Sequence, residues 1–195
     1  MKTILEYLRE SNNKNNNIKQ AMLGYVDGSE THVNRYLRNN KRGHYTKKEL
    51  DAIIAKMDPC FVDTWHESTP LYRTVDWDFM KNLFGITQDN LEEHIGDIIQ
   101  DKAYMSTTDT LQSPWGTWTS GELVFIITAN DPIACFDVNQ HYNSKEIESY
   151  YQNEILLPRG TKLRIDSYEI RQNKKSGKRL FPDEGTYFIK CTVVK

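Results

Sequence analysis

The sequence has few cysteines, little net charge and no long apolar run. Cys60, Cys135 and Cys191 are far apart and odd in number, which fits neither a disulfide framework nor a metal site and predicts a reducing compartment. A formal net charge of −2 gives no global field toward nucleic acid or anionic lipid. No apolar run is long enough to span a membrane, and Met1 to Arg9 is too polar for a signal peptide. We therefore expect a cytoplasmic protein with no membrane partner.

The glycine-rich loops that usually cradle phosphates are missing as well. Neither Gly-x-Gly-x-x-Gly nor Gly-x-x-x-x-Gly-Lys occurs. The chain is instead rich in aromatic residues, with 11 Tyr, 7 Phe and 4 Trp, and these bury much area in a core. A chain of 195 residues predicts a single domain over residues 1–195. We expect a helical lead-in over residues 1–60 and a mainly β core over residues 65–195.

Helical patterns come first and strand patterns follow. Thr46 and Glu49 have the spacing of a capping box before an apolar run, and Trp77 to Phe84 and Asn90 to Ile99 also predict helices. Runs of β-forming residues predict strands over residues 69–75, 103–108, 123–128, 133–138, 154–157, 162–171 and 186–194. Helices followed by strands favour an α+β fold with an antiparallel or mixed sheet.

One short segment combines a carboxylate, an amide and a strand. Gln152 and Glu154 are two residues apart, so in an extended segment both side chains point to one face. The apolar run Ile155–Leu157 and then Pro-Arg-Gly follow at once. This order predicts a carboxylate and an amide together at a strand entrance, aimed at a ligand.

Two other segments carry side chains suited to the same ligand. Arg73 lies inside an apolar strand segment, where it is either an edge residue reaching solvent or a forked donor for phosphate or carboxylate. Ser106, Thr107 and Thr108 reflect either ordinary β-propensity or hydroxyls that orient a ribose. Trp115 and Trp118 occupy a loop rich in Gly, Pro, Ser and Thr. They are either core residues or stacking partners for a planar ring.

In this order, these elements resemble a known family. Arg73, then Ser106-Thr107-Thr108, then Gln152-x-Glu154 before Leu-Leu-Pro-Arg-Gly-Thr is similar to the arginine–Ser-Thr-Ser–glutamate group of mono-ADP-ribosyltransferases. The Gln-x-Glu type includes the C3-like and pierisin-like branches. The segment Ala21 to Asn40 also looks like the helical lead-in of this family. The resemblance implies an α+β fold with a mixed or antiparallel β-sandwich core, and NAD as co-substrate without a metal.

The resemblance also implies roles for individual residues. Glu154 is the catalytic carboxylate, because cleavage of the nicotinamide–ribose bond develops positive charge on the ribose, as in glycoside cleavage. Arg73, preceded by Tyr72, clamps the diphosphate, and Ser106 orients Glu154 or the ribose. Thr107 and Thr108 order the nicotinamide pocket, and the two loop tryptophans stack on the cofactor.

Gln152 faces the acceptor in this interpretation, together with Tyr150 and Tyr151. An amide pairs with another amide or with a base edge through two hydrogen bonds. For a glutamine at this position, the resemblance implies a nucleic-acid base or a protein side chain other than arginine as the acceptor. The chain departs from the family pattern at Thr108, where the motif has serine, and at Ser149, where relatives have an aromatic residue. Residues 109–121 contain no arginine for phosphate.

The expected partner is a macromolecular acceptor, either RNA, DNA or protein. The sequence shows no translocation or receptor-binding part, which favours an intracellular toxin or a phage or defence effector, with an antitoxin or inhibitor protein as a further partner. Three alternatives stay open. They are an NAD glycohydrolase using Glu154 with water as acceptor, a non-catalytic binding module, and an ordinary α+β domain.

Overall fold

The computed structural model describes residues 22–26, 30–66, 69–110, 123–142, 153–171 and 185–195. The chain forms two compact units. The first combines Met1–Trp65, Asp101–Met105 and Ala134–Gly160, and the second combines His66–Gln100, Ser106–Ile133 and Thr161–Lys195. Each unit draws on three separate stretches of the sequence. The single domain expected from chain length stays a prediction.

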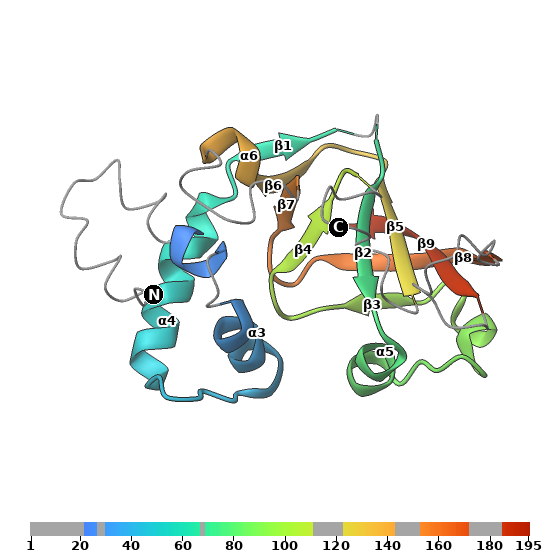
Figure 1. The fold of residues 1–195 in the computed structure, drawn as a ribbon, viewed down its shortest axis with the longest axis horizontal. Helices are drawn as coiled ribbons and strands as arrows, with labels where there is room; N and C mark the ends of the chain where they lie inside the picture. The colour runs from blue at the N-terminus through green and yellow to red at the C-terminus, as the bar shows by residue number, and fades with distance from the viewer. Residues whose placement is uncertain (1–21, 27–29, 67–68, 111–122, 143–152, 172–184) are drawn as a thin grey trace, which may run out of the picture. The chain divides into compact units, whose positions relative to one another are not determined.

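The first unit is built from helices and three short strands (Figure 1). Its elements are α3 (Glu30–Asn39), α4 (Lys47–Met57), the 3₁₀ turn η2 (Asp58–Cys60), β1 (Asp63–Trp65), β6 (Ile133–Asp137), α6 (Val138–His141) and β7 (Glu154–Leu157). β6 pairs with β7 in antiparallel register, with Phe136 opposite Leu156 and Asp137 opposite Ile155. All four residues of β7 are buried, as expected for an apolar strand inside a core.

Local signals fix the helix ends of this unit. The capping box predicted for α4 is confirmed, since the Glu49 amide donates to Thr46 Oγ1 at 3.2 Å and Glu49 Oε2 accepts from the Thr46 amide at 2.8 Å. α3 ends where Asn40 adopts a φ of 55°, and the Asn40 amide donates to the Tyr36 carbonyl at 2.8 Å. Asparagine is among the residues that tolerate this left-handed conformation at a helix end.

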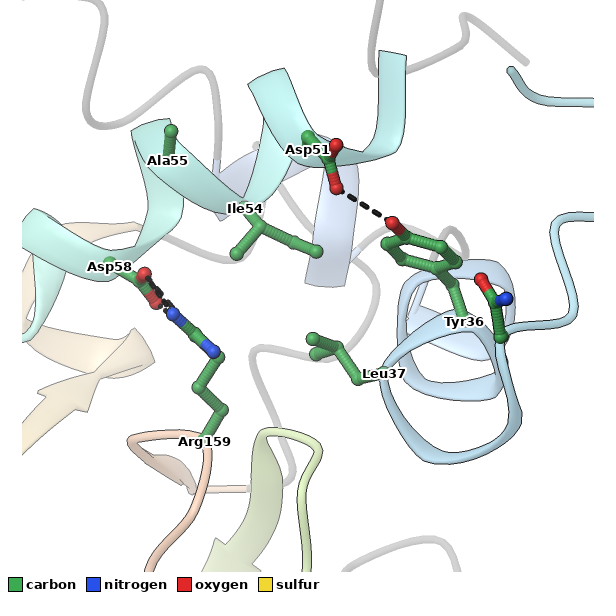
Figure 2. Close-up of a pocket in the computed structure, with 8 residues that line it drawn as sticks. Tyr36, Leu37, Asp51, Ile54, Ala55, Asp58 and Arg159 are labelled. Carbon is green, nitrogen blue, oxygen red and sulfur yellow. Dashed lines mark hydrogen bonds and ion pairs between the residues drawn. The ribbon is translucent and has the colours of Figure 1, made fainter. Parts of the chain in front are cut away.

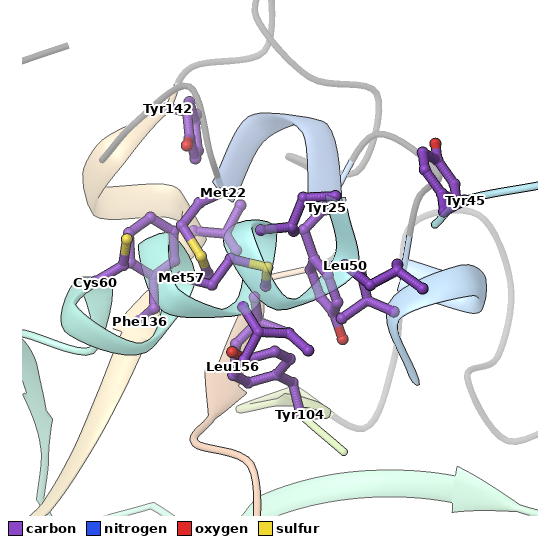
Figure 3. Close-up of a cluster of buried hydrophobic side chains, with 14 residues drawn as sticks. Met22, Tyr25, Tyr45, Leu50, Met57, Cys60, Tyr104, Phe136, Tyr142 and Leu156 are labelled. Atoms are coloured by element: carbon purple, nitrogen blue, oxygen red, sulfur yellow. The ribbon is translucent and has the colours of Figure 1, made fainter. Parts of the chain in front are cut away.

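A hydrophobic cluster joins the helices of the first unit to its strands (Figure 3). Tyr25 and Tyr104 meet edge to face, with ring centroids 5.6 Å apart, and Phe61 stacks on Tyr104 at 5.4 Å. Such ring pairs add to the area that each ring buries. The buried members are Met22, Tyr25, Val33, Tyr45, Leu50, Ile53, Ile54, Met57, Cys60, Tyr104, Phe136, Val138, Tyr142 and Leu156.

The second unit is mainly a sheet. Its elements are β2 (Leu71–Val75), α5 (Trp77–Phe84), the 3₁₀ turn η3 (Leu91–His94), β3 (Ile98–Gln100), β4 (Met105–Thr108), β5 (Leu123–Ala129), β8 (Lys162–Arg171) and β9 (Thr186–Val194). β2 pairs antiparallel with β4 and β5, β8 pairs antiparallel with β9 and β3, and β5 pairs parallel with β9. The parallel pair makes the sheet mixed.

The α+β class with a mixed sheet is confirmed. Among the described strands, the order within the first unit is β1-β6-β7 and the order within the second unit is β4-β2-β5-β9-β8-β3. The predicted bounds of β7, β8 and β9 match the observed ones. Within the described parts of the chain, no helix combines the length and the apolar character needed to cross a membrane.

The helix predicted for residues 90–99 is wrong. Only Leu91 to His94 form a 3₁₀ turn, and Ile98 to Gln100 form the edge strand β3. Gly96 adopts a φ of 95° and its amide donates to the Ile165 carbonyl at 2.7 Å. A residue with that φ breaks a helix, and pairing with β8 then draws the following residues into the sheet.

Candidate active site

Arg73 lies at the centre of β2, between two neighbouring strands. Its Cα is opposite that of Phe125 in β5, and that of Tyr72 is opposite Thr108 in β4. Arg73 is half-buried, and its Nη1 donates to the carbonyl oxygen of Ser106 at 2.9 Å. The structure therefore brings Arg73 and the Ser-Thr-Thr segment together, as the sequence predicts.

Helix α5 supports the guanidinium of Arg73. The Asp76 carboxylate caps this helix by accepting from the Phe79 amide at 2.6 Å. The cap fixes the first turn, from which the Phe79 ring contacts Arg73, with 5.4 Å between the guanidinium carbon and the ring centroid. A cation over an aromatic ring at this distance is stabilised and held in orientation. Sequence reasoning missed Phe79, since a phenylalanine in an amphipathic helix is usually a core residue.

The three hydroxyls of β4 have different environments. Thr107 and Thr108 are buried, with 4% and 3% of their surface exposed. The Thr108 hydroxyl accepts from the Thr110 amide at 3.2 Å, so it stabilises the turn at the strand end. Ser106 is only partly buried. Of the three, Ser106 is the hydroxyl that a ligand reaches most easily.

Glu154 is the first residue of β7 and belongs to the first unit. It is 9% exposed, an uncommon burial for a carboxylate without a structural or functional reason. The preceding Asn153 has a φ of 49°, so the backbone is not extended there. The extended backbone that strand alternation requires is therefore absent at Asn153, and a shared face for residues 152 and 154 stays a prediction, because Gln152 lies outside the described residues.

The β6–α6 connection packs beside the start of β7. Asp137 ends β6 and caps α6, accepting from the Asn139 amide at 3.0 Å. Asn139 Nδ2 in turn donates to Asn153 Oδ1 at 2.7 Å. Asp63 Oδ2 holds the same region from β1, accepting from the Asp137 amide at 2.8 Å and lying 2.8 Å from Nε2 of His141. Sequence reasoning missed helix α6 and this contact with Asn153.

The Pro-Arg-Gly turn after β7 is tied to helix α4 through Asp58. Arg159 donates from Nε to Asp58 Oδ1 and from Nη2 to Asp58 Oδ2, both at 2.9 Å, and the Tyr104 hydroxyl donates to Asp58 Oδ1 at 2.8 Å. Burial alone raises the pKa of Asp58, but these hydrogen bonds and the Arg159 charge outweigh it, so the pKa is below its usual value. The pKa of Tyr104 is raised, first by burial and then by its bond to Asp58. Tyr104 therefore stays a donor.

A second buried acid holds the same turn. Asp101 accepts from Arg38 Nε at 2.9 Å and from Arg38 Nη2 at 2.6 Å, with only 1% of its side chain exposed. The Asp101 carbonyl accepts from the Gly160 amide at 2.9 Å. Two acids therefore anchor the end of β7 to the helical lead-in.

A pocket of about 460 Å³ opens between α3, α4 and the turn after β7 (Figure 2). Its lining residues are Tyr36, Leu37, Asn40, Asp51, Ile54, Ala55, Asp58 and Arg159. The Tyr36 hydroxyl donates to Asp51 at 2.7 Å, and Figure 2 shows the Asp58–Arg159 pair on the opposite side. None of the predicted site residues that the structure describes lines this pocket.

The remaining predicted site residues lie outside the described residues. These are Trp115, Trp118, Tyr150, Tyr151 and Gln152. Within the described part of the chain, no group of three or more His, Cys, Asp or Glu side chains is placed to hold a metal ion. The groups available for chemistry in these ranges are thus a buried carboxylate in the first unit and an arginine with a serine in the second.

Comparisons with known proteins identify relatives of the chain. The chain is 26% identical over 148 residues to the epidermal cell differentiation inhibitor of Staphylococcus aureus, a match that covers 66% of this chain. The chain spans about half the length of that curated relative, 55%.

Solved structures with the same fold include ADP-ribosylating toxins. BECa of a Clostridium perfringens binary enterotoxin, solved with NADH, aligns with a TM-score of 0.73 and 19% identity over 98% of this chain and 46% of that one. C3stau2 of S. aureus, solved with NAD, aligns with a TM-score of 0.66 and 15% identity over 97% and 91%. The chain therefore has the fold of NAD-dependent ADP-ribosyltransferase toxins of the C3-like kind.

A match between the sequence and a family model shows the family of this chain. The model of the ADP-ribosyltransferase exoenzyme family matches residues 2–185, nearly the whole chain. This confirms the resemblance drawn from the order of Arg73, the Ser-Thr-Thr segment and Glu154. The chain belongs to the ADP-ribosyltransferase exoenzyme family.

Proposed function

We propose that this protein transfers ADP-ribose from NAD to a macromolecular acceptor, with Glu154 as the catalytic carboxylate. The observation that carries the proposal is the burial of Glu154 at the entrance of β7 in a chain of this family. A carboxylate in a poorly hydrated position interacts strongly with a developing cation.

The proposed reaction breaks the bond between the nicotinamide nitrogen and C1′ of the ribose. The bonding electrons leave with nicotinamide, which departs as a neutral molecule, and positive charge develops on the ribose. Glu154 stabilises that charge and accepts a hydrogen bond from the 2′-hydroxyl. A nucleophilic atom of the acceptor then forms a bond to C1′, and its proton is lost to solvent.

Arg73 and Ser106 are the residues proposed to hold NAD. The Arg73 guanidinium is a planar fork suited to a diphosphate, and its contacts with Phe79 and the Ser106 carbonyl limit its freedom. Ser106, the least buried hydroxyl of its segment, is proposed to orient the ribose. Thr107 and Thr108 act indirectly, by keeping β4 in place, because both are buried.

The acceptor is proposed to be a nucleic-acid base or a protein side chain other than arginine. The support is the chemistry of Gln152, whose amide offers paired donor and acceptor groups. One experiment names the acceptor class. The protein is incubated with NAD labelled in the adenylate part and with separate pools of protein, RNA and DNA, and label retained on one pool identifies it. Free ADP-ribose alone would favour an NAD glycohydrolase. The absence of NAD turnover would contradict the proposal that the protein is an enzyme.

Gln152→Ala tests the acceptor role directly. We expect this variant to lose transfer while keeping part of the NAD hydrolysis, because the amide contacts the acceptor and not the ribose. Gln100→Ala, on the edge strand β3, is the matched control and should keep both activities. An equal loss of transfer and hydrolysis in Gln152→Ala would contradict an acceptor role.

We further propose that the protein acts in the cytosol. The support is its cysteines, all three of which are free and buried. A chain that folds without disulfides suits a reducing compartment.

A further inference from the structure

We infer that Asn153 and Asn139 are positioning residues that aim Glu154, an inference that rests on the proposed function. Asn153 immediately precedes Glu154 and has a φ of 49°. Among the described residues, Asn40 and Asn153 are the non-glycine residues with positive φ. Residues in uncommon backbone conformations often cluster at functional sites.

The Asn153 conformation sets the direction in which β7 begins. β7 starts at the next residue, so the turn at Asn153 decides how the chain enters the strand and where the first side chain of the strand points. Asparagine tolerates positive φ far better than most residues with a β-carbon. An alanine at this position would favour extended backbone and change the direction in which the chain enters β7.

A side-chain hydrogen bond holds that turn in place. Asn139 Nδ2 donates to Asn153 Oδ1 at 2.7 Å. Asn139 is itself fixed, because Asp137 accepts from its backbone amide at 3.0 Å, and Asp137 pairs with Ile155 in the strand register. The start of β7 is thus held twice by the β6–α6 connection, once by backbone pairing and once by the two amides.

The hydrogen bond from Asn139 to Asn153 leaves the other end of the Asn139 side-chain amide in an unfavourable environment. Its Oδ1 is buried and has no hydrogen-bond partner among the residues that the structure describes. A buried polar atom without a partner is unfavourable, and in a native protein it calls for an explanation. A gain in the placement of Glu154 provides that explanation.

Four variants test the inference through nicotinamide release from NAD. Asn153→Ala should lower kcat by roughly 10- to 100-fold, as expected when a catalytic group is misplaced by about 1 Å, while KM for NAD changes little. Asn153→Gly keeps the left-handed turn and loses only the amide. Asn153→Gly and Asn139→Ala should therefore lose kcat to the same extent, and each should lose less than Asn153→Ala. Asn40→Ala is the matched control, since Asn40 has a φ of 55° at the end of α3, and its kcat should stay at the wild-type level.

The double variant Asn139→Ala with Asn153→Gly separates a shared contact from two independent ones. If the two amides act through one hydrogen bond, its kcat should equal that of either single variant. Equal kcat in Asn153→Ala and wild type, or parallel losses in Asn153→Ala and Asn40→Ala, would overturn the inference. If Asn153→Ala does not fold, the kcat values of Asn153→Gly and Asn139→Ala give the test. A lowered kcat in both supports the inference, and wild-type kcat in both overturns it. A wild-type chain that releases no nicotinamide would instead overturn the proposed function, and the inference with it.

Discussion

The guanidinium of Arg73 donates from Nη1 to the carbonyl oxygen of Ser106, with 2.9 Å between the two atoms. This bond joins β2 to β4 at the place where both strands carry predicted site residues. The Phe79 ring contacts the same guanidinium from α5. The residue proposed to bind the diphosphate of NAD therefore also organises the segment proposed to hold the ribose.

Arg73→Lys keeps the positive charge and removes the planar fork. We expect kcat/KM for NAD to fall roughly 10- to 100-fold, the value of one or two charged hydrogen bonds. The measurement is steady-state nicotinamide release over a range of NAD concentrations. Arg164→Lys is the control, because Arg164 forms an exposed pair with Asp166. Equal kcat/KM in Arg73→Lys and wild type would contradict a role in NAD binding.

Arg159→Ala tests the anchor of the turn that follows β7. The pKa of Asp58 is lowered in the folded chain, so Asp58 binds a proton more weakly in the folded chain than in the unfolded chain. The stabilisation is therefore complete above the ordinary carboxyl pKa of ~3.9 and is lost as pH falls through the folded value. Arg159→Ala should lower the free energy of unfolding by about 0.5–1 kcal/mol at pH 7, since both side chains are partly exposed.

The pH dependence makes this prediction specific. The difference between wild type and Arg159→Ala in urea unfolding should shrink as pH falls below ~4, because the unfolded chain then binds a proton at Asp58 and folded wild type binds it only at a lower pH. Lys195→Ala removes a more exposed pair with Asp131 and should have little effect at any pH. A constant difference from pH 7 to pH 3 would show that Arg159 stabilises by packing and not by its charge.

The three cysteines should be unreactive in the native protein. Burial, with nearby carboxylates as a smaller cause, raises the pKa of Cys60, Cys135 and Cys191 to about 12. At pH 8 roughly one thiol in 10⁴ is then a thiolate, the reactive form. A chromogenic disulfide reagent should label no cysteine in the folded chain and three in urea. Rapid labelling without loss of structure would contradict this burial.

Much of the fold follows from local sequence signals. The bounds of β8 and β9 match their predictions, because β9 is rich in β-branched and aromatic residues and β8 begins with apolar residues at alternate positions, Leu163 and Ile165. The capping box at Thr46 gave the start of α4, since both partners are three residues apart. The Asn90 to Ile99 prediction failed because apolar spacing does not show that the Gly96 amide bonds to the Ile165 carbonyl.

The sequence identified residues of the candidate site, but it did not predict the contacts that position them. Arg73 and Ser106 were identified from their order in the chain, and their hydrogen bond is a consequence of the β2–β4 pairing. The support from Phe79 was missed because a phenylalanine in an amphipathic helix is usually a core residue, and the support from Asn139 was missed because its contact with Asn153 joins separate elements. The positive φ of Asn153 was missed as well, since the apolar run that follows it directed the prediction toward an extended segment, although asparagine is favoured in turns.

Glu154→Gln tests the central claim most directly. This change keeps the size of the side chain and removes its charge, so it isolates the electrostatic stabilisation of the ribose cation. We predict that nicotinamide release at saturating NAD falls by about 10²-fold or more, whereas Glu169→Gln, at an exposed partner of Arg171, keeps the wild-type rate. Wild-type nicotinamide release from Glu154→Gln, or none from the unmodified chain, would contradict the account.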